Sequence, residues 1–342
     1  MTSSVFMNTL ASEKPTQTPI WMMRQAGRYL AEYRAVRQNQ KDFISFCLNS
    51  EKACEVTLQP IERFDFDAAI IFSDILMVPW ALDRNVHFIP GTGPKLTPLS
   101  SDTDLDDTLL DKVEDRLAPV GRAIELTRSK LAADKALIGF AGAPWTVITY
   151  MIEGGSSRDF AETRQWLWSY PKEFEALLDY VTQATISFLT MQAKAGADVL
   201  MLFDSWASAV PAERRDQIVI APVRWIVRAL REQGIKQPII GFPKGIGEGI
   251  IAYADEAEID ALAIDHMTDP VWVDSVLPKN MPVQGNLDPL SLLVGGSQMI
   301  KSIDHILDSF RDRPHIFNLG HGITPPTPIS SVEQMVQRVR KS

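Results

Sequence analysis

Short runs of apolar residues recur along the chain, and each run ends in a polar or glycine-rich turn. The runs are largely continuous rather than alternating, which is typical of parallel strands covered on both faces. The predicted strands are Ile20–Met23, Ala68–Phe72, Leu137–Phe140, Val199–Phe203, Ile239–Phe242, Ala261–Ile264, Pro282–Gln284 and Ile316–Leu319.

Helical patterns lie between these strands. The longest predicted helix is Pro171–Ala195, and Pro222–Gln233 and Glu248–Asp255 are shorter examples. Repeated alternation of strand and helix indicates βαβ units. Eight units predict an α/β fold with a single (β/α)8 TIM-type barrel over residues 1–342, with a deep polar cleft at the C-terminal ends of the strands. An open doubly wound sheet is the alternative.

Two segments depart from this pattern. Residues 83–107 are irregular and predict a long excursion after the second strand, and residues 1–16 are expected to be flexible. The N-terminus lacks a basic start followed by an apolar core, so no secretory signal is predicted. No apolar run approaches the ~18–20 residues of a membrane span. We therefore expect a cytoplasmic protein.

Composition and charge narrow the class of partner. Of the 342 residues 45% are hydrophobic and 23% charged, which is ordinary for a soluble globular protein. The net charge of −9 argues against nucleic acid or an anionic membrane as the main partner. Cys47 and Cys54 are predicted to be buried in one helix. Two cysteines are too few for a disulfide framework, which fits a reducing compartment.

Polar residues follow the predicted strands, where a barrel of this kind carries its active site. In chain order they are Arg24, Asp74, Tyr150, Asp204 with Ser205, Lys244, Asp265, Asn286 with Asp288, and His321. One such residue means little, because turns are polar. A series of them is what a large polar cavity requires.

The segment from Gln17 to Lys41 is cationic, with a net charge of +4 from five cations and one anion. Its arginines are Arg24, Arg28, Arg34 and Arg37. An arginine fork matches a carboxylate in bidentate geometry. A helix is predicted from near Tyr29, which would place Tyr29, Tyr33 and Arg37 on one face. An anion site and a solvated basic helix face both fit this segment.

Three further features each allow two interpretations. Pro144 opens a predicted helix after a strand, and this turn either receives an anion or is a plain connection. His321 lies between two glycines and is either a structural histidine or one that binds an anion or transfers protons near neutral pH. Asp74 follows a strand and is either a helix cap or a site residue.

Several familiar motifs are missing. Gly245–Gly249 lacks the dinucleotide-loop spacing, and no phosphate-loop motif occurs. No Cys–His set has zinc-ligand spacing, and Ser205 lacks the G-x-S-x-G context of a nucleophile. These negatives favour an anion-binding barrel without a nucleotide or a metal.

Two long segments, Pro19–Arg28 and Gly139–Gly155, closely resemble the two characteristic segments of the uroporphyrinogen decarboxylase family. Shorter strings match in the same order: Phe72–Asp74, Leu202–Ser205, Gln284–Asp288 and Asn318–His321. The resemblance therefore runs from about residue 17 to the C-terminus.

This resemblance implies a carboxy-lyase that needs no metal or organic cofactor and is usually a homodimer. The implied reaction converts uroporphyrinogen III to coproporphyrinogen III by loss of four acetate carboxyls as CO2, in the synthesis of haem and related tetrapyrroles. The residues that the motifs imply at the substrate are Arg24, Gln25, Arg28, Arg37, Asp74, Tyr150, Phe203, Ser205 and His321. Among them Asp74, Arg24, Arg28 and Tyr150 form the expected catalytic set.

The implied substrate gives these residues physical roles. It carries eight carboxylates, and the arginine segment offsets their charge. Asp74 suits the four pyrrole N–H groups, and its charge would stabilise a pyrrole protonated on carbon, which accepts the electrons left by CO2. Arg24 and Arg28 would handle the reacting acetate. Arginine is a poor acid in water, so whether it stabilises charge or delivers a proton is left open.

Three rival interpretations carry different expectations. A methyltransferase of the same superfamily, acting with a corrinoid and zinc, needs Cys and His ligands that the chain does not space suitably. A non-catalytic tetrapyrrole-binding protein would keep the cationic pocket but could lose Asp74 or Tyr150, and both are present. A sugar-phosphate barrel enzyme is the interpretation that remains without the motifs.

Overall fold

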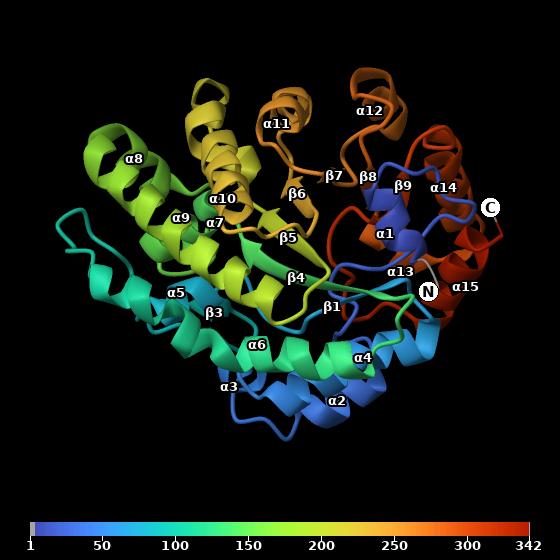
Figure 1. The fold of residues 1–342 in the computed structure, drawn as a ribbon, viewed down its shortest axis with the longest axis horizontal. Coiled ribbons are helices and arrows are strands. Elements are labelled where there is room, and N and C mark those ends of the chain that lie inside the picture. The colour runs from blue at the N-terminus through green and yellow to red at the C-terminus, as the bar shows by residue number, and fades with distance from the viewer. Residues whose placement is uncertain (1–3, 342) are drawn as a thin grey trace.

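A curled sheet of seven parallel strands forms the centre of the protein, in a computed structural model that describes residues 4–341. Its strands in spatial order are β1 (Ala68–Ile70), β4 (Ala136–Gly142), β5 (Val199–Asp204), β6 (Ile239–Pro243), β7 (Ala261–Ala263), β8 (Val283–Leu287) and β9 (His315–Leu319). Spatial order equals chain order, so each strand returns beside the previous one. All seven lie near the predicted positions and are buried along their length, because helices surround them (Figure 1).

Helices connect the strands and cover the sheet. The longer ones are α4 (Ser50–Phe64), α6 (Val113–Lys130), α9 (Pro171–Lys194), α10 (Ala221–Glu232), α14 (Gly296–Ser309) and α15 (Ile329–Val339). The shorter ones are α1 (Val5–Leu10), α2 (Ala31–Arg37), α3 (Phe43–Cys47), α5 (Met77–Ala81), α7 (Pro144–Glu153), α8 (Ala161–Ser169), α11 (Ile250–Glu256), α12 (Pro270–Val276) and α13 (Pro289–Val294). The three helices predicted by range agree within two residues at either end. None of the helices in the described part of the chain combines the length and the apolar character needed to cross a bilayer.

The N-terminal segment lies between β9 and β1. Phe317 N donates to Pro19 O (2.8 Å), and Asp67 N on the other side donates to Ile20 O (2.9 Å). Asp67 Oδ2 also accepts from Ile20 N at 2.7 Å. The predicted strand Ile20–Met23 is nevertheless reduced to one parallel bridge, Ile20 with Phe317. The chain turns directly after this bridge, because Gln25 N bonds to Met22 O (3.1 Å).

Two local expectations need correction here, and a third concerns the start of the chain. Cys47 and Cys54 do not share a helix: Asn49 caps the start of α4 by accepting from Lys52 N, which separates α4 from α3. Both cysteines are buried and free, as expected. The excursion 83–107 contains a hairpin, β2 (His87–Ile89) with β3 (Gly93–Lys95).

The start of the chain is more ordered than the predicted flexible segment 1–16. Ser4 caps α1, and Phe6 and Leu10 on this helix are buried in the core. Apolar contact therefore holds residues 5–10 in place, whereas the expectation for residues 1–3 lies outside the described part of the chain.

Candidate active site

Side chains from both ends of the chain gather at the carboxyl ends of the strands. Asp74 and Tyr150 both lie within electrostatic reach of Arg24. His321, which follows β9, is also within reach of Arg24, and of Lys244 after β6. The predicted series of strand-end residues therefore includes one connected group of charged and polar side chains.

The Arg24 loop is held by buried hydrogen bonds. Gln25 is fully buried; its Nε2 donates to Ala68 O (3.1 Å), and its Oε1 accepts from Met22 N (3.1 Å). Met23 N donates to Asn318 Oδ1 at 3.0 Å. These bonds hold Arg24 in a left-handed conformation (φ 63°) with its side chain exposed. The Gln25 side chain, expected at the substrate, bonds to the backbone at Met22 and at Ala68.

Gly322 gives the Arg24 side chain its space. A Cβ atom at Gly322 would collide with Arg24 Cδ, Cγ and Nε. Glycine is the residue that permits such a close approach. The His321 loop and the Arg24 loop are therefore fitted to each other.

Asp74 is a half-buried carboxyl group in the turn after β1. Its Oδ1 accepts from Leu76 N at 2.9 Å. The helix α5 begins later, at Met77, so Asp74 is not the cap residue of that helix. Burial raises the pKa of Asp74 to about 6, against the opposing effects of the Leu76 N–H and of Arg24. At neutral pH Asp74 is therefore mostly ionised, although burial disfavours the ionised form.

Tyr150 and Phe203 are aromatic side chains near the carboxyl ends of the strands, and each packs against other rings: the Tyr150 ring centroid lies 6.4 Å from the Trp206 ring centroid. Pro144 opens α7 as predicted, and α7 carries Tyr150, which is 8% exposed. Burial raises the pKa of Tyr150, so its hydroxyl stays protonated. Phe203 packs edge-on against Phe140 and Phe242, with ring centroids 5.4 and 6.0 Å away. Ser205, half-buried, follows β5 at the same end of the sheet.

His321 is held neutral. Burial is the first cause that lowers its pKa, to about 3, and Arg24, Lys244 and His266 lower it further. At neutral pH the ring is therefore uncharged. The neutral ring keeps a donor nitrogen and an acceptor nitrogen for hydrogen bonds.

The other arginines of the cationic segment differ in setting. Arg28 is exposed, and its carbonyl accepts from Arg34 Nη1 (2.6 Å). Arg37 lies over the Phe46 ring at 5.9 Å. Tyr33 is within electrostatic reach of both Arg28 and Arg37, so these two cations flank one buried tyrosine. Tyr29 precedes the first residue of α2, Ala31, so the predicted helical face shared with Arg37 is wrong.

Three residues of this region were not among the expected substrate contacts. Asp204 is buried, accepts from Thr146 Oγ1 (2.5 Å), and has its pKa raised to about 7 by burial. Lys244 and His266 reach His321 from the loops after β6 and β7. Asp204 and Lys244 had been marked as strand-end residues, whereas His266, one position after Asp265, carried no separate signal.

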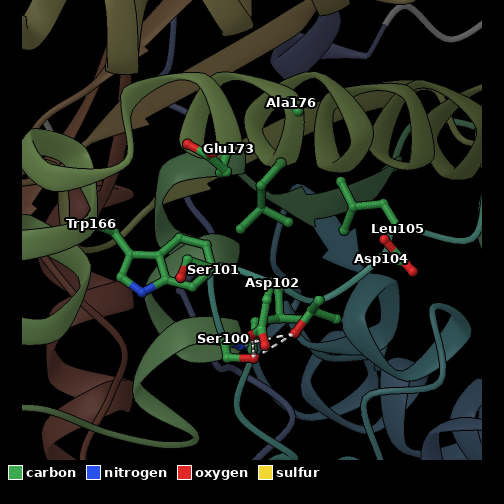
Figure 2. A pocket seen from close by; sticks show the side chains of 11 residues that line it. Ser100, Ser101, Asp102, Asp104, Leu105, Trp166, Glu173 and Ala176 are labelled. Atoms are coloured by element: carbon green, nitrogen blue, oxygen red, sulfur yellow. Dashed lines mark hydrogen bonds between the residues drawn. The ribbon is translucent and has the colours of Figure 1, made fainter.

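A separate hollow lies away from this group. It has a volume of about 350 Å3 and lies between the loop 99–105 and the helices α8 and α9 (Figure 2). Trp166 and Glu173 line it, and Ser100 bonds to Asp102 and Thr103 on its floor. None of the predicted site residues lines it. Within residues 4–341, no three His, Cys, Asp or Glu side chains come together as a metal site.

Comparisons with known proteins identify the family and the fold of the chain. The model of the family described as Uroporphyrinogen decarboxylase (URO-D) matches residues 1–342. A relative named uroporphyrinogen decarboxylase from Maricaulis maris is 49% identical over 99% of this chain and 98% of its own length. A second relative of that name, from Chelativorans sp., is 48% identical over 94% of either chain. The solved structure of a methyltransferase from Methanosarcina mazei has a TM-score of 0.81 over 99% of both chains at 18% identity, which shows a common fold.

Proposed function

The chain belongs to the uroporphyrinogen decarboxylase family, and we propose that its strand-end residues remove the four acetate carboxyl groups of uroporphyrinogen III. The products are coproporphyrinogen III and four CO2, and the reaction is a step of haem and tetrapyrrole biosynthesis. The observation that carries the assignment of the site is Asp74, a half-buried carboxylate with a cation, Arg24, in its reach.

The reaction needs a sink for one electron pair. Protonation of a pyrrole carbon makes that ring cationic, and the bond between the acetate methylene and its carboxyl group then breaks. CO2 leaves, and the electron pair enters the ring. A proton added to the methylene and one lost from the ring carbon complete the methyl group, so each cycle consumes one proton net.

Asp74 suits the electrostatic part of this reaction. Its carboxylate accepts hydrogen bonds from the pyrrole N–H groups and stabilises the cationic ring, more strongly in a dry site than in water. Because Leu76 N already holds Oδ1, the carboxylate is oriented before the substrate arrives. Arg24 and Arg28 bind the reacting acetate and exclude alternative orientations.

The remaining residues hold the substrate periphery. Tyr150 and neutral His321 offer hydrogen-bond donors, and Ser205 offers a third. Arg37 adds positive charge near Arg28, while Phe203 provides an apolar surface for the macrocycle. The Gln25 side chain contributes by fixing the Arg24 loop.

The proposal extends to the whole assembly. The segment around Ile20 acts as the eighth position of a closed (β/α)8 barrel, with a polar cleft at the C-terminal ends of the strands. This assignment is supported by the hydrogen bonds that the segment forms with Phe317 on one side and with Asp67 on the other. The protein acts as a cytoplasmic homodimer that contains one barrel domain per chain over residues 1–342.

A turnover assay tests the function. Uroporphyrinogen III is supplied anaerobically without added metal, and the quenched, oxidised products are separated by carboxylate number. Seven-, six-, five- and four-carboxylate species should appear in sequence, and a chelator should leave the rate unchanged. A folded protein that binds the substrate and releases no CO2 would support the non-catalytic binding protein instead, and zinc found by metal analysis would support the methyltransferase.

A further inference from the structure

Lys244 lies at the strand-end site, and none of the described residues 4–341 forms an ion pair with it. Its Nζ lies over the Trp206 ring, 5.7 Å from the centroid. The side chain is half-buried, so it is not a freely solvated surface lysine. A cation in this setting loses hydration that the ring only partly replaces.

The structure holds the Lys244 backbone firmly from two neighbouring loops. Lys244 N donates to Asp204 O (3.1 Å), and Lys244 O accepts from Ser208 N (3.2 Å). The next residue, Gly245, donates its N–H to Asp265 Oδ2 at 2.7 Å. A flexible side chain that starts from a fixed backbone position reaches a restricted volume, as a binding residue requires.

A second polar group without a partner lies on the same side of the site. His266 Nδ1 is buried and forms no hydrogen bond within the described residues. His266 and Lys244 both lie within electrostatic reach of His321. Buried polar atoms in native proteins almost always have partners, so one left without a protein partner at a strand end indicates a ligand or water position.

We propose that Lys244, assisted by His266, binds a propionate carboxylate of the tetrapyrrole and thereby fixes the rotational position of the macrocycle. This inference rests on the proposed function. Lys244 then determines which ring faces Arg24 in each cycle. It acts in binding and orientation, and does not take part in proton transfer.

The position of Lys244 favours a propionate over an acetate. β6 is three strands along the sheet from β1, after which Asp74 lies. At about 4.8 Å per strand the two backbones are roughly 14 Å apart along the curved sheet. Arg24 lies within electrostatic reach of both Asp74 and His321, whereas Lys244 affects His321 and is not among the groups that shift the pKa of Asp74. A group at Lys244 therefore meets the periphery of a macrocycle centred at Asp74, and only a propionate remains there through all four cycles.

The test separates binding from turnover. Coproporphyrinogen III carries the four propionates and no acetate, so its affinity is measured anaerobically by calorimetry without any reaction. The variants are Lys244→Met, which keeps the apolar stem on Trp206, and Lys244→Arg, which keeps the charge. Lys236→Met is the matched control, because Lys236 is exposed before β6 at the other end of the same strand.

We expect Lys244→Met to weaken coproporphyrinogen binding by about 10- to 100-fold, the range for a hydrogen bond to a charged group. Lys244→Arg should restore most of the affinity, and Lys236→Met should bind like the wild type. In turnover, Lys244→Met should raise KM for uroporphyrinogen III and let partly decarboxylated intermediates escape. Matched unfolding midpoints would show that the fold is intact.

Two results would overturn the inference while leaving the proposed function in place. One is a Lys244→Met protein that binds coproporphyrinogen like Lys236→Met while the wild type turns over uroporphyrinogen. The other is weakened binding of uroporphyrinogen alone, which would assign Lys244 to an acetate. A wild type that neither binds nor decarboxylates would remove the proposed function, and this inference with it.

Discussion

Replacing Asp74 by asparagine should stabilise the fold while it removes activity. Asn has the shape of Asp, and its Oδ1 can keep the hydrogen bond from Leu76 N. The substitution therefore removes the charge without breaking the turn. A group retained against the stability of the fold is characteristic of a functional site.

The magnitude follows from the pKa of Asp74. It rises from an ordinary value of 3.8 to about 6, roughly two units, and each unit corresponds to about 1.4 kcal/mol. Below pH 3.8 both the folded and the unfolded protein carry neutral Asp74, so the residue contributes nothing. Between pH 3.8 and 6 the unfolded state loses its proton first, and the fold loses stability as the pH rises. Above pH 6 the cost is complete, at about 2–3 kcal/mol.

Urea unfolding at a series of pH values measures this effect. At pH 8 Asp74→Asn should be about 2–3 kcal/mol more stable than the wild type, and near pH 4 the two should coincide. The control is Asp104→Asn, an exposed carboxylate on the surface loop, which should change little at either pH. At the same time kcat should fall by about 100-fold or more, as for the loss of one preorganised electrostatic group. Equal stability at pH 8, or near-normal turnover, would refute the reasoning.

Three further predictions concern the loops around the site. Gly322→Ala should lower kcat/KM by at least about tenfold with little change in unfolding midpoint, because the new methyl group displaces the flexible Arg24 side chain. Gly320→Ala should instead lower the unfolding midpoint, because its Cβ would strike the backbone of His266. A lower midpoint for Gly322→Ala than for Gly320→Ala would contradict this packing. His321→Gln should leave the shape of the kcat/KM profile between pH 5 and 8 unchanged, because the pKa of His321 is about 3, and a lost inflection would disprove a neutral His321. Tyr150→Phe should raise KM about tenfold through loss of a hydroxyl donor to a carboxylate, so an unchanged KM would remove Tyr150 from substrate binding.

The repeated strands were predictable because a buried parallel strand leaves a continuous apolar run in the sequence. The start of the chain was not, since Ile20–Met23 has the same apolar composition but turns away after one bridge. That turn depends on Gln25 reaching Ala68 O, a contact between distant residues that no local pattern records. The end of one helix at Cys47 and the start of the next before Cys54 were easier to predict from sequence, because Asn49 between them is a good cap residue.

The candidate site was predicted in part for a similar reason. Local patterns left Asp74 and His321 with two interpretations each, and only the family motifs separated them. The neutral state of His321 comes from burial and from three basic neighbours on other loops, so it required the fold. Lys244 had been marked as a strand-end residue, yet only the three-dimensional structure shows that it forms no ion pair with the described residues 4–341.

The contact of the first segment with β9 sets an order of events during protein synthesis. Met23 and Asn318, which are joined by a hydrogen bond, are 295 positions apart in the chain. The Arg24 loop is therefore translated early but gains its fixed shape only after β9 has left the ribosome. Until then the side chains of Trp21 and Met22, both fully buried in the finished fold, are exposed to solvent. Chaperones that bind apolar segments should meet this enzyme at its N-terminal end, and its activity should appear only late in folding.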